Sequence, residues 1–185
     1  MLHMEQKNYK LEILNKLLKS PNHVRGIASS LNTNHMMVSR KVNELLKENV
    51  VDYKQEGKNK VYFLKKTIEA RQYILMAEQY KLLQFLKKYP NLRKIIEKIQ
   101  KNKKIKLAIL FGSYAKGIAK KDSDIDIYIE TTNRKIKQEL EILDSKLNVK
   151  IGKYDRTSFL IKEIEKNHII IKGMEEYYEK REFFE

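Results

Sequence analysis

Two short stretches in the second half of the chain carry residues that could bind phosphate and a divalent cation. Gly112 and Ser113 follow a wholly apolar run, 107–111, which is typical of a buried strand. Exposed backbone amides at a strand-to-helix turn can bind phosphate, because free N–H groups and the dipole of the following helix point at it. Ten residues further on come Asp124 and Asp126. The pattern predicts a phosphate site beside a cation site.

The two aspartates alternate with isoleucines at 125, 127 and 129, as expected of a strand with a period of two. Both carboxylates then lie on one face, about 7 Å apart, where their oxygens suit a hard divalent cation. Taken singly, Gly-Ser is a common turn and Asp-x-Asp often marks a solvent-facing edge. Their combination at this spacing, after an apolar strand, favours one functional site.

The segment IKLAILFGSYAKGIAKKDSDIDIYIE (105–130) resembles the signature of the polymerase-β-like nucleotidyltransferases, in particular the minimal nucleotidyltransferase family. The resemblance extends over roughly residues 90–175. It implies that Gly112 and Ser113 position the triphosphate of an NTP, with ATP expected, and that Asp124 and Asp126 hold Mg²⁺ or Mn²⁺. The implied reaction is the transfer of a nucleoside monophosphate to an acceptor hydroxyl.

That family normally completes its site with a third carboxylate on a later strand. Here the corresponding stretch, 148–154, has Lys150 where the acid is expected, and the nearest acid is Asp155. Either Asp155 completes the catalytic set with Asp124 and Asp126, or the third acid is missing and Lys150 contacts a phosphate. The second alternative describes a domain that binds or senses nucleotide without turnover.

The elements that must position this site follow in order along the chain. We expect helices at 133–147 and 157–166 around a strand at 149–154, which together give an α/β domain with a mixed sheet over 105–185. In the last ten residues, Tyr177, Tyr178, Phe183 and Phe184 either anchor a C-terminal helix or meet a partner.

The first part of the chain has a different pattern. Apolar spacing predicts helices at 8–19, 23–31 and 35–48, followed by two β-type runs, 50–54 and 60–64, around Gly57. This order resembles the winged helix-turn-helix of bacterial and archaeal regulators. The third helix would enter the major groove and the hairpin would lie along the backbone. The candidates for base edges are Asn34, His35, Ser39, Arg40 and Asn43, and those for phosphates are Lys41, Lys54, Lys58 and Lys60. A winged helix used for protein contacts is the alternative.

The charge distribution favours DNA. The 185 residues carry a net charge of +15, and all of the excess lies in the first 106 residues, with +9 in 1–90 and +6 in 91–106. A protein with such an excess of positive charge usually binds a polyanion such as nucleic acid. The chain has no cysteine, which excludes a disulfide framework, a zinc-thiolate site and a thiol nucleophile.

Two further helices, 67–88 and 92–101, connect the two parts. We therefore expect an α+β chain with a winged helix-turn-helix domain at 1–66, a helical connector at 67–104 and a nucleotidyltransferase-like domain at 105–185. The broad apolar stripe of the first connecting helix suggests a homodimer. The basic cluster on the second is either a solvated face or an extension of a nucleic-acid surface.

Two main functions remain open at this point, and recognition of RNA by the basic segment is a third possibility. One is a nucleotidyltransferase that the winged helix brings to DNA, with an acceptor on a partner protein such as a separate HEPN-type toxin. The other is a transcriptional regulator that senses nucleotide. No apolar run approaches the roughly 20 residues of a membrane span, and residues 1–7 lack the apolar core of a signal peptide, so we expect a cytoplasmic protein without a membrane partner.

Overall fold

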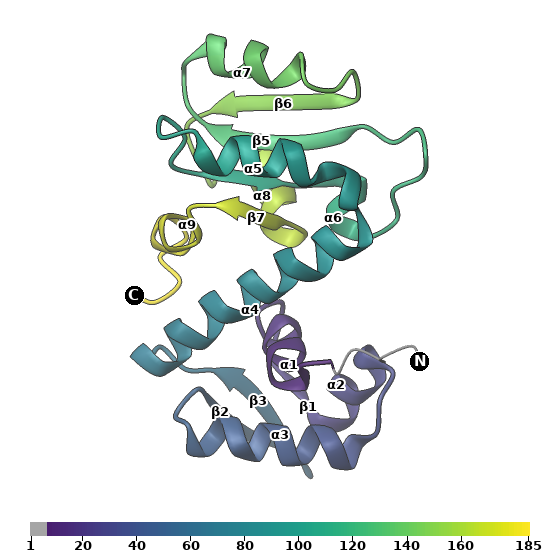
Figure 1. The fold of residues 1–185 in the computed structure, drawn as a ribbon. Helices are drawn as coiled ribbons and strands as arrows, with labels where there is room; N and C mark the ends of the chain where they lie inside the picture. Colours follow the sequence, from purple (N-terminus) through teal and green to yellow (C-terminus); the bar gives the residue numbers. More distant parts are fainter. Residues whose placement is uncertain (1–6) are drawn as a thin grey trace. The chain divides into compact units, whose positions relative to one another are not determined.

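The computed structural model describes residues 7–185, and its internal contacts divide the chain into two compact units. The first reaches to Tyr80 and includes Phe184 and Glu185, and the second is Lys81–Phe183 (Figure 1). From the sequence we expected domain limits at 66/67 and 104/105. These limits remain predictions, because the division into two units does not test them. The expectation that the chain begins without a signal peptide rests largely on residues 1–6, which lie outside the described part.

Three helices build the core of the first unit. They are α1 (Tyr9–Leu17), α2 (Val24–Leu31) and α3 (His35–Lys47), so the three predicted helices are confirmed with slightly shorter ends. The apolar positions that predicted them are buried, among them Leu14, Val38, Val42 and Leu45. The side chain of Asn34 accepts a 2.7 Å hydrogen bond from the amide of Met36, which caps the start of α3.

A small antiparallel sheet completes this unit. Strands β2 (Val51–Glu56) and β3 (Asn59–Leu64) form the predicted hairpin, and the short strand β1 (Asn22–His23) pairs with β3 on the other side. Pairing continues to Glu56 and Asn59, which leaves only Gly57 and Lys58 in the turn. Gly57 has a φ of +59°, as a two-residue hairpin turn requires. Three helices and a hairpin in this order are a winged helix-turn-helix fold.

The long helix α4 (Ile68–Lys88) runs from the first unit into the second, where η1 (Pro90–Leu92) and α5 (Arg93–Lys101) follow it. Its first half packs into the core of the first unit through Ala70 and Ala77. Its second half packs into the core of the second unit through Leu82 and Phe85. Both predicted connecting helices are therefore present, and each half of α4 contributes to the core of its own unit.

The predicted mixed sheet forms the centre of the second unit, and it has four strands. Its order is β6 (Leu147–Gly152), β5 (Ile125–Glu130), β4 (Ala108–Leu110) and β7 (Ile169–Lys172). Strands β5 and β6 are parallel, and the other two pairs are antiparallel. The end of β4 therefore lies beside the beginnings of β5 and β6, which is where the predicted site residues fall.

Helices cover the two faces of this sheet. The isoleucines of β5 share one core with α5 and with α7 (Arg134–Glu141). The other helices of the unit are α6 (Gly112–Lys116), α8 (Phe159–Lys166) and α9 (Met174–Lys180). Tyr177 and Tyr178 of α9 are buried, so these two C-terminal aromatic residues anchor a helix within their own chain.

One predicted element is shorter than expected. The helix predicted over 133–147 ends at Glu141, because Leu147 already belongs to β6 and a short loop must intervene. In the described part of the chain, no helix has both the length and the apolar character that crossing a membrane would take.

Candidate functional site

The turn after β4 packs directly against the side chain of Asp126. Gly112 begins α6 with a φ of +69°, and a Cβ placed there would lie 2.3 Å from Oδ2 of Asp126. Only glycine therefore fits between the turn and this carboxylate. The amide of Phe111 also donates to the backbone oxygen of Asp126 at 2.9 Å, which fixes the end of β4 beside the start of β5. The structure thus joins the predicted phosphate turn and one predicted carboxylate.

The second carboxylate, that of Asp124, lies just before the start of the strand that carries Asp126. Strand β5 begins at Ile125, so Asp124 precedes it by one residue and is exposed, whereas Asp126 is half-buried. Ser113 lies beside Gly112 in the first turn of α6. Beyond Asp126 the strand is buried on both faces, because Tyr128 is covered as well as the isoleucines. The four predicted nucleotide-site residues are therefore found at one edge of the sheet.

A residue that the sequence analysis missed, Asn148, faces Asp126 across the parallel strands. The two residues are partners in the β5–β6 register, and the amide nitrogen Nδ2 of Asn148 donates to Oδ1 of Asp126 at 2.8 Å. Lys150, placed by the sequence analysis where an acid was expected, pairs instead with Tyr128, two residues further along, and is exposed. The sequence signal that could have pointed to Asn148 was its polar side chain between the apolar residues Leu147 and Val149, at the start of a strand.

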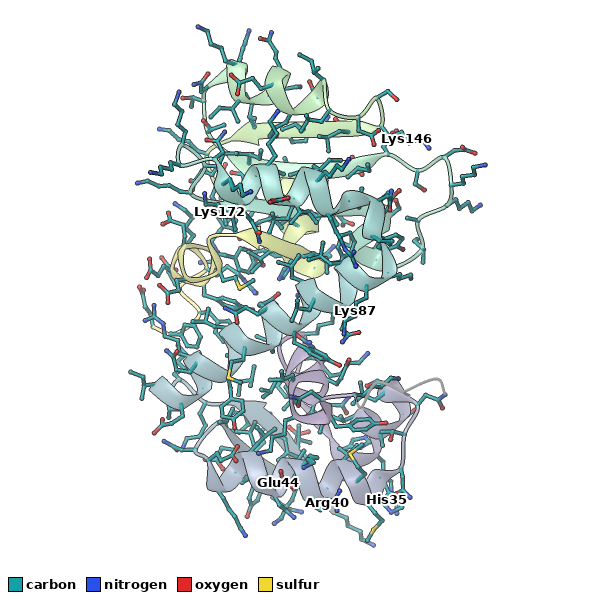
Figure 2. The ribbon with its side chains drawn as sticks, viewed as in Figure 1. His35, Arg40, Glu44, Lys87, Lys146 and Lys172 are labelled. Carbon is teal, nitrogen blue, oxygen red and sulfur yellow. The ribbon has the colours of Figure 1, made fainter. Side chains whose placement is uncertain are left out.

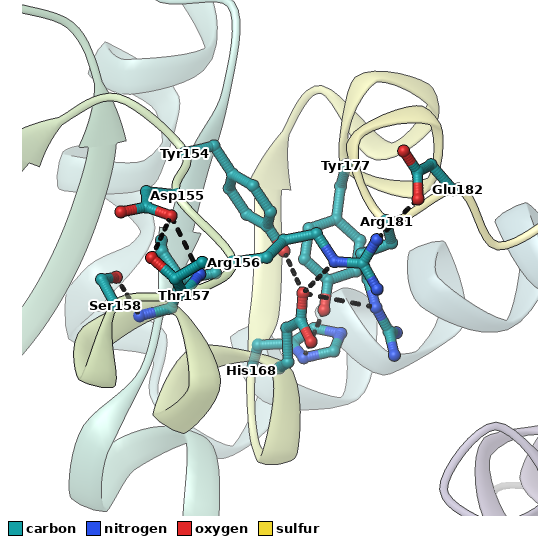
Figure 3. Close-up of polar contacts among 11 residues, drawn as sticks. Tyr154, Asp155, Arg156, Thr157, Ser158, His168, Tyr177, Arg181 and Glu182 are labelled. Carbon is teal, nitrogen blue, oxygen red and sulfur yellow. Dashed lines mark hydrogen bonds and ion pairs between the residues drawn. The ribbon is translucent and has the colours of Figure 1, made fainter.

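Asp155 is not brought to the other two aspartates. Because β5 and β6 are parallel and end together at Glu130 and Gly152, Asp155 follows at the opposite end of the strands from Asp126. Its carboxylate accepts hydrogen bonds from the hydroxyl of Thr157 at 2.7 Å and from the Thr157 amide at 2.9 Å. These bonds, which are drawn as dashed lines in Figure 3, lower the pKa of Asp155. The residue closes a turn before α8.

Next to Asp155 lies a polar network that ties this end of the unit together. The hydroxyl of Tyr154 donates to Glu165 at 2.9 Å, and burial raises the pKa of Tyr154 far above its usual range. Arg156 and Arg181 approach the same Glu165 oxygen at 3.9 and 3.8 Å (Figure 3). A shared carboxylate of this kind stabilises the packing of α8 and α9, and it lies away from the Gly112–Asp126 edge.

Asp124 and Asp126 are the carboxylates at the Gly112–Asp126 edge that could hold a magnesium ion. Across residues 7–185 there is no group of three or more His, Asp or Glu side chains placed to hold a metal. Asp124 and Asp126 supply two carboxylates, and Oδ1 of Asp126 already accepts the Asn148 amide. Mg²⁺ commonly binds through one or two carboxylates together with substrate phosphates and waters. The residues suit an ion that arrives with a triphosphate, and they do not suit a second ion enclosed by protein carboxylates.

Lysines surround this edge, and some of them are engaged within the unit. Lys116 pairs with Glu163 at 2.6 Å, and the ammonium group of Lys146, which is labelled in Figure 2, donates to the backbone oxygen of Lys121 at 2.7 Å. Lys120 and Lys121 are exposed in the loop between Gly117 and Asp124. Exposed lysines therefore flank the two aspartates, while Asp122 of the same loop and Glu163 balance part of their charge.

In the first unit, the outer face of α3 presents most of the predicted base-contacting residues. His35, Arg40 and Asn43 are exposed and Ser39 is half-exposed, as Figure 2 shows for His35 and Arg40 along the outer side of the helix. A shallow depression follows this face, lined by Met36, Ser39, Arg40, Asn43, Glu44 and Lys47. Asn34 is exposed as well, but its side-chain oxygen caps α3.

Lys41 is placed differently from its neighbours on α3. Its ammonium group contacts both carboxylate oxygens of Glu44 at 2.9 Å. Lys10 of α1 joins this group by bonding to Glu48 at 2.7 Å and to Glu44 at 3.2 Å. The hydrogen bond from Lys10 lowers the pKa of Glu48, and the hydroxyl of Tyr73 also donates to it. The structure thus places Lys41 in an ion-pair cluster between helices.

The wing carries the remaining predicted lysines. Lys58 lies exposed in the two-residue turn, where no part of the fold covers it. The ammonium group of Lys60 lies 4.1 Å from the centre of the Tyr53 ring, a cation–π contact across the two strands. Lys54 pairs with Glu56 at 2.6 Å on the exposed surface. Lys58 and Lys60 remain available to a phosphate backbone, because an exposed cation–π contact is weak.

Comparison with known proteins agrees with the fold of the second unit. Residues 93–177 match the family model described as Polymerase beta, Nucleotidyltransferase. A search of curated proteins gave no match. The matched region contains both the Gly112–Asp126 edge and Asn148.

Two solved structures resemble parts of this chain. One is a homodimeric winged helix-turn-helix DNA-binding domain from Mycobacterium bovis, a possible ArsR-family transcriptional regulator, with 24% identity over 38% of this chain, 65% of that chain and a TM-score of 0.35. The other is the adhesin competence repressor AdcR from Streptococcus pyogenes, with 16% identity over 50% of this chain, 69% of that chain and a TM-score of 0.41. The chain spans less than two thirds of the Mycobacterium domain. The family match and the observed elements identify residues 93–177 as a polymerase-β-type nucleotidyltransferase domain that follows an N-terminal winged helix-turn-helix domain.

Proposed function

We propose that this chain is a DNA-binding nucleotidyltransferase that moves a nucleoside monophosphate from an NTP, with ATP as the expected donor, to an acceptor hydroxyl. The observation that carries the proposal is the packing of Gly112 against Asp126, where a Cβ would lie 2.3 Å from the carboxylate. A backbone turn this close to a carboxylate allows phosphates and a bound cation to occupy one small site.

Each residue at this edge has a part in the proposed reaction. The amides of Gly112 and Ser113 would bind the phosphates of the NTP, and Asp124 and Asp126 would hold Mg²⁺. Magnesium supplies charge neutralisation of the phosphates while the bond to the α-phosphorus changes. The acceptor hydroxyl loses its proton to water and its oxygen forms a bond to the α-phosphorus, the bond from that phosphorus to the oxygen bridging the α- and β-phosphates breaks, and pyrophosphate leaves. The protein contributes chiefly by positioning the reactants and by its electrostatics.

DNA binding is the proposed role of the first unit. Arg40 and Asn43 on the outer face of α3 would reach base edges in the major groove, where these side chains pair with guanine and adenine respectively. Lys58 and Lys60 of the wing would contact phosphates, which supply affinity without sequence information. All four residues are exposed, which supports this assignment. Lys60 also makes a weak contact with the ring of Tyr53.

The transfer reaction can be tested with two labels. The full chain is incubated with Mg²⁺ and an extract of the cells it comes from, which supplies the acceptor. The ATP that is added carries its label on either the α- or the γ-phosphate. Transfer of the nucleoside monophosphate predicts an acceptor labelled from the α-position alone, lost in Asp126→Asn and kept in Asp122→Asn. Asp122 is an exposed acid of the same loop and serves as the matched control. Label from the γ-position, or equal labelling in both variants, would contradict the proposal.

Asn148 favours a second candidate function, a regulator that senses nucleotide without turnover. An amide in hydrogen-bond contact with Asp126 supplies no third carboxylate, so the site has fewer charged ligands for the metal ions that turnover would use. This candidate predicts that ATP changes the affinity for DNA while no labelled product forms. A labelled product from the purified chain with its acceptor would exclude it.

We also propose two protein partners. A hydroxyl on a separate HEPN-type toxin is the proposed acceptor, which the family resemblance supports, and purified toxin can be used in the labelling experiment. A second copy of the chain is the proposed partner of α4, since Ile68 and Met76 are 74% and 48% exposed on that helix. A solution mass of one chain would contradict the dimer.

A further inference from the structure

We propose that the outer face of α5 is a second DNA-binding surface, one that contacts the phosphate backbone of duplex DNA without reading its sequence. Three lysines of this helix, Lys94, Lys98 and Lys101, define what we call the α5 lysine row. Because they are spaced four and then three residues apart, they lie along one stripe of the helix. At 1.5 Å per residue, their spacing along the axis is about 6 Å and about 4.5 Å.

The charge of this row serves no evident purpose within the fold. Lys101 pairs with Glu97 at 2.5 Å, but the lysine side chain remains 75% exposed, and such surface pairs contribute little stability. Within residues 7–185, no carboxylate pairs with Lys94 or Lys98. Residues 91–106 hold seven basic residues and one acid, whereas 107–185 are balanced. This concentration of charge distinguishes α5 from the rest of the nucleotidyltransferase domain.

The fold holds the row on a fixed helix. The inner face of α5 is buried through Ile95, Ile96 and Ile99, which pack into the core of the second unit. At the end of the helix, the ammonium group of Lys172, which is labelled in Figure 2, donates to the backbone oxygens of Gln100 and Asn102 at 2.9 and 2.8 Å. The last carbonyls of α5 are therefore capped from β7. A surface that is already ordered loses less entropy when it binds.

The composition of the exposed face indicates the kind of partner. The exposed positions of α5 are Arg93, Lys94, Glu97, Lys98, Gln100 and Lys101. They include no apolar side chain that could enter a lipid bilayer and no aromatic ring that could stack on an unpaired base. Lysine acts on phosphate as a point charge. The partner that offers regularly spaced phosphates and keeps its bases covered is a nucleic-acid duplex.

The salt dependence of DNA binding tests this surface. Binding of the full chain to a labelled duplex of random sequence is measured by fluorescence anisotropy over a series of salt concentrations. The test variant replaces Lys94, Lys98 and Lys101 by glutamine. The matched control replaces three exposed lysines elsewhere in the same unit, Lys150, Lys153 and Lys166, and so removes the same charge. A second control replaces the same three lysines by arginine, which keeps their charge. Any change in DNA binding that it shows is caused by the substitution itself and not by the loss of charge.

We expect the glutamine variant of the row to have a shallower slope of log K against log salt concentration. The magnitude of the slope should fall by about 0.9 for each phosphate contact that is lost. The arginine variant and the matched control should keep the slope of the unmodified chain. Equal slopes in the row variant and the matched control would overturn the proposal. Because the row lies outside α3 and the wing, its effect should persist in a chain that carries Arg40→Ala. The test is thus independent of base recognition by the winged helix.

Discussion

The side-chain amide of Asn148 donates a 2.8 Å hydrogen bond to Oδ1 of Asp126, across the parallel strands β5 and β6. The other oxygen of the same carboxylate, Oδ2, faces Gly112 so closely that no Cβ would fit between them. Asp126 is thus held from both sides, by the turn after β4 and by a neutral side chain of β6. The identity of residue 148 therefore sets how many carboxylates meet at this edge.

Replacing Asn148 by aspartate should make the stability of the second unit depend on a divalent cation. Two carboxylates at this distance raise the pKa of one of them or require a bound cation. We expect the melting temperature of Asn148→Asp to rise with added Mg²⁺, by an amount that corresponds to about 2.7 kcal/mol when the ion exceeds its Kd a hundredfold. Asn148→Ala, which loses the donor without gaining charge, is the control. An identical Mg²⁺ response in both variants would show that residue 148 does not face a cation site.

Replacing Gly112 by alanine should both destabilise the second unit and weaken nucleotide binding. The added Cβ would force the Asp126 carboxylate to turn away and break its bond to Asn148. Gly117 is a matched control, since its φ is +75° and the nearest atom to an added Cβ is the flexible end of Lys88 at 3.6 Å. Denaturant unfolding should give a cost of about 1 kcal/mol for Gly117→Ala, from backbone strain alone, and a larger cost for Gly112→Ala. Equal costs would argue against close packing on Asp126.

Neighbouring residues of α3 should differ in their effect on DNA binding. Arg40 is exposed on the outer face, whereas the ammonium group of Lys41 is held by Glu44. Arg40→Ala should cost about 1–3 kcal/mol on the selected operator and relax the base preference at one position. Lys41→Gln should change affinity less. Operators selected from random duplexes and then titrated with each variant provide the measurement, and a larger loss for Lys41→Gln would place a different face of α3 in the groove.

The ion-pair cluster of the first unit should make its stability sensitive to acid. The hydrogen bond from Lys10 lowers the pKa of Glu48 below its ordinary value of 4.5. The stabilising contribution is therefore fully present above about pH 4.5 and is lost as the pH falls through the lower, folded-state pKa. The difference in unfolding free energy between the unmodified chain and Glu48→Gln should stay constant above this pH and shrink below it. A difference that grows on acidification would mean that Glu48 is not ionised in the folded state.

Local patterns in the sequence were sufficient to predict the main helices and the site turn. Leucines, isoleucines and valines at helical spacing mark α1 and α3 because each of these helices buries one face. The apolar run before Gly112 marks β4 because a central strand is buried on both sides. The two aspartates were recognised from alternation, although Asp124 lies just before the strand and not within it.

What the sequence could not provide is the register between strands. The contact of Asn148 with Asp126 arises from parallel pairing of segments more than twenty residues apart, which no local pattern encodes. An asparagine at a strand start also resembles an ordinary polar edge residue. The same register separates Asp155 from the site, and it brings β6 to begin at Leu147, inside the helix that periodicity had predicted.

The most direct test of the account is calorimetric titration of Mg²⁺–ATP into the full chain and into two variants. Asp124→Asn removes one of the two carboxylates of the site, and Asp122→Asn removes the same charge from the exposed loop before it. We predict that the unmodified chain and Asp122→Asn bind equally, and that Asp124→Asn loses at least about tenfold in affinity, or about 1.4 kcal/mol. Equal binding by Asp124→Asn, or binding of ATP by the unmodified chain that is unchanged without Mg²⁺, would contradict a nucleotide site at the Gly112–Asp126 edge.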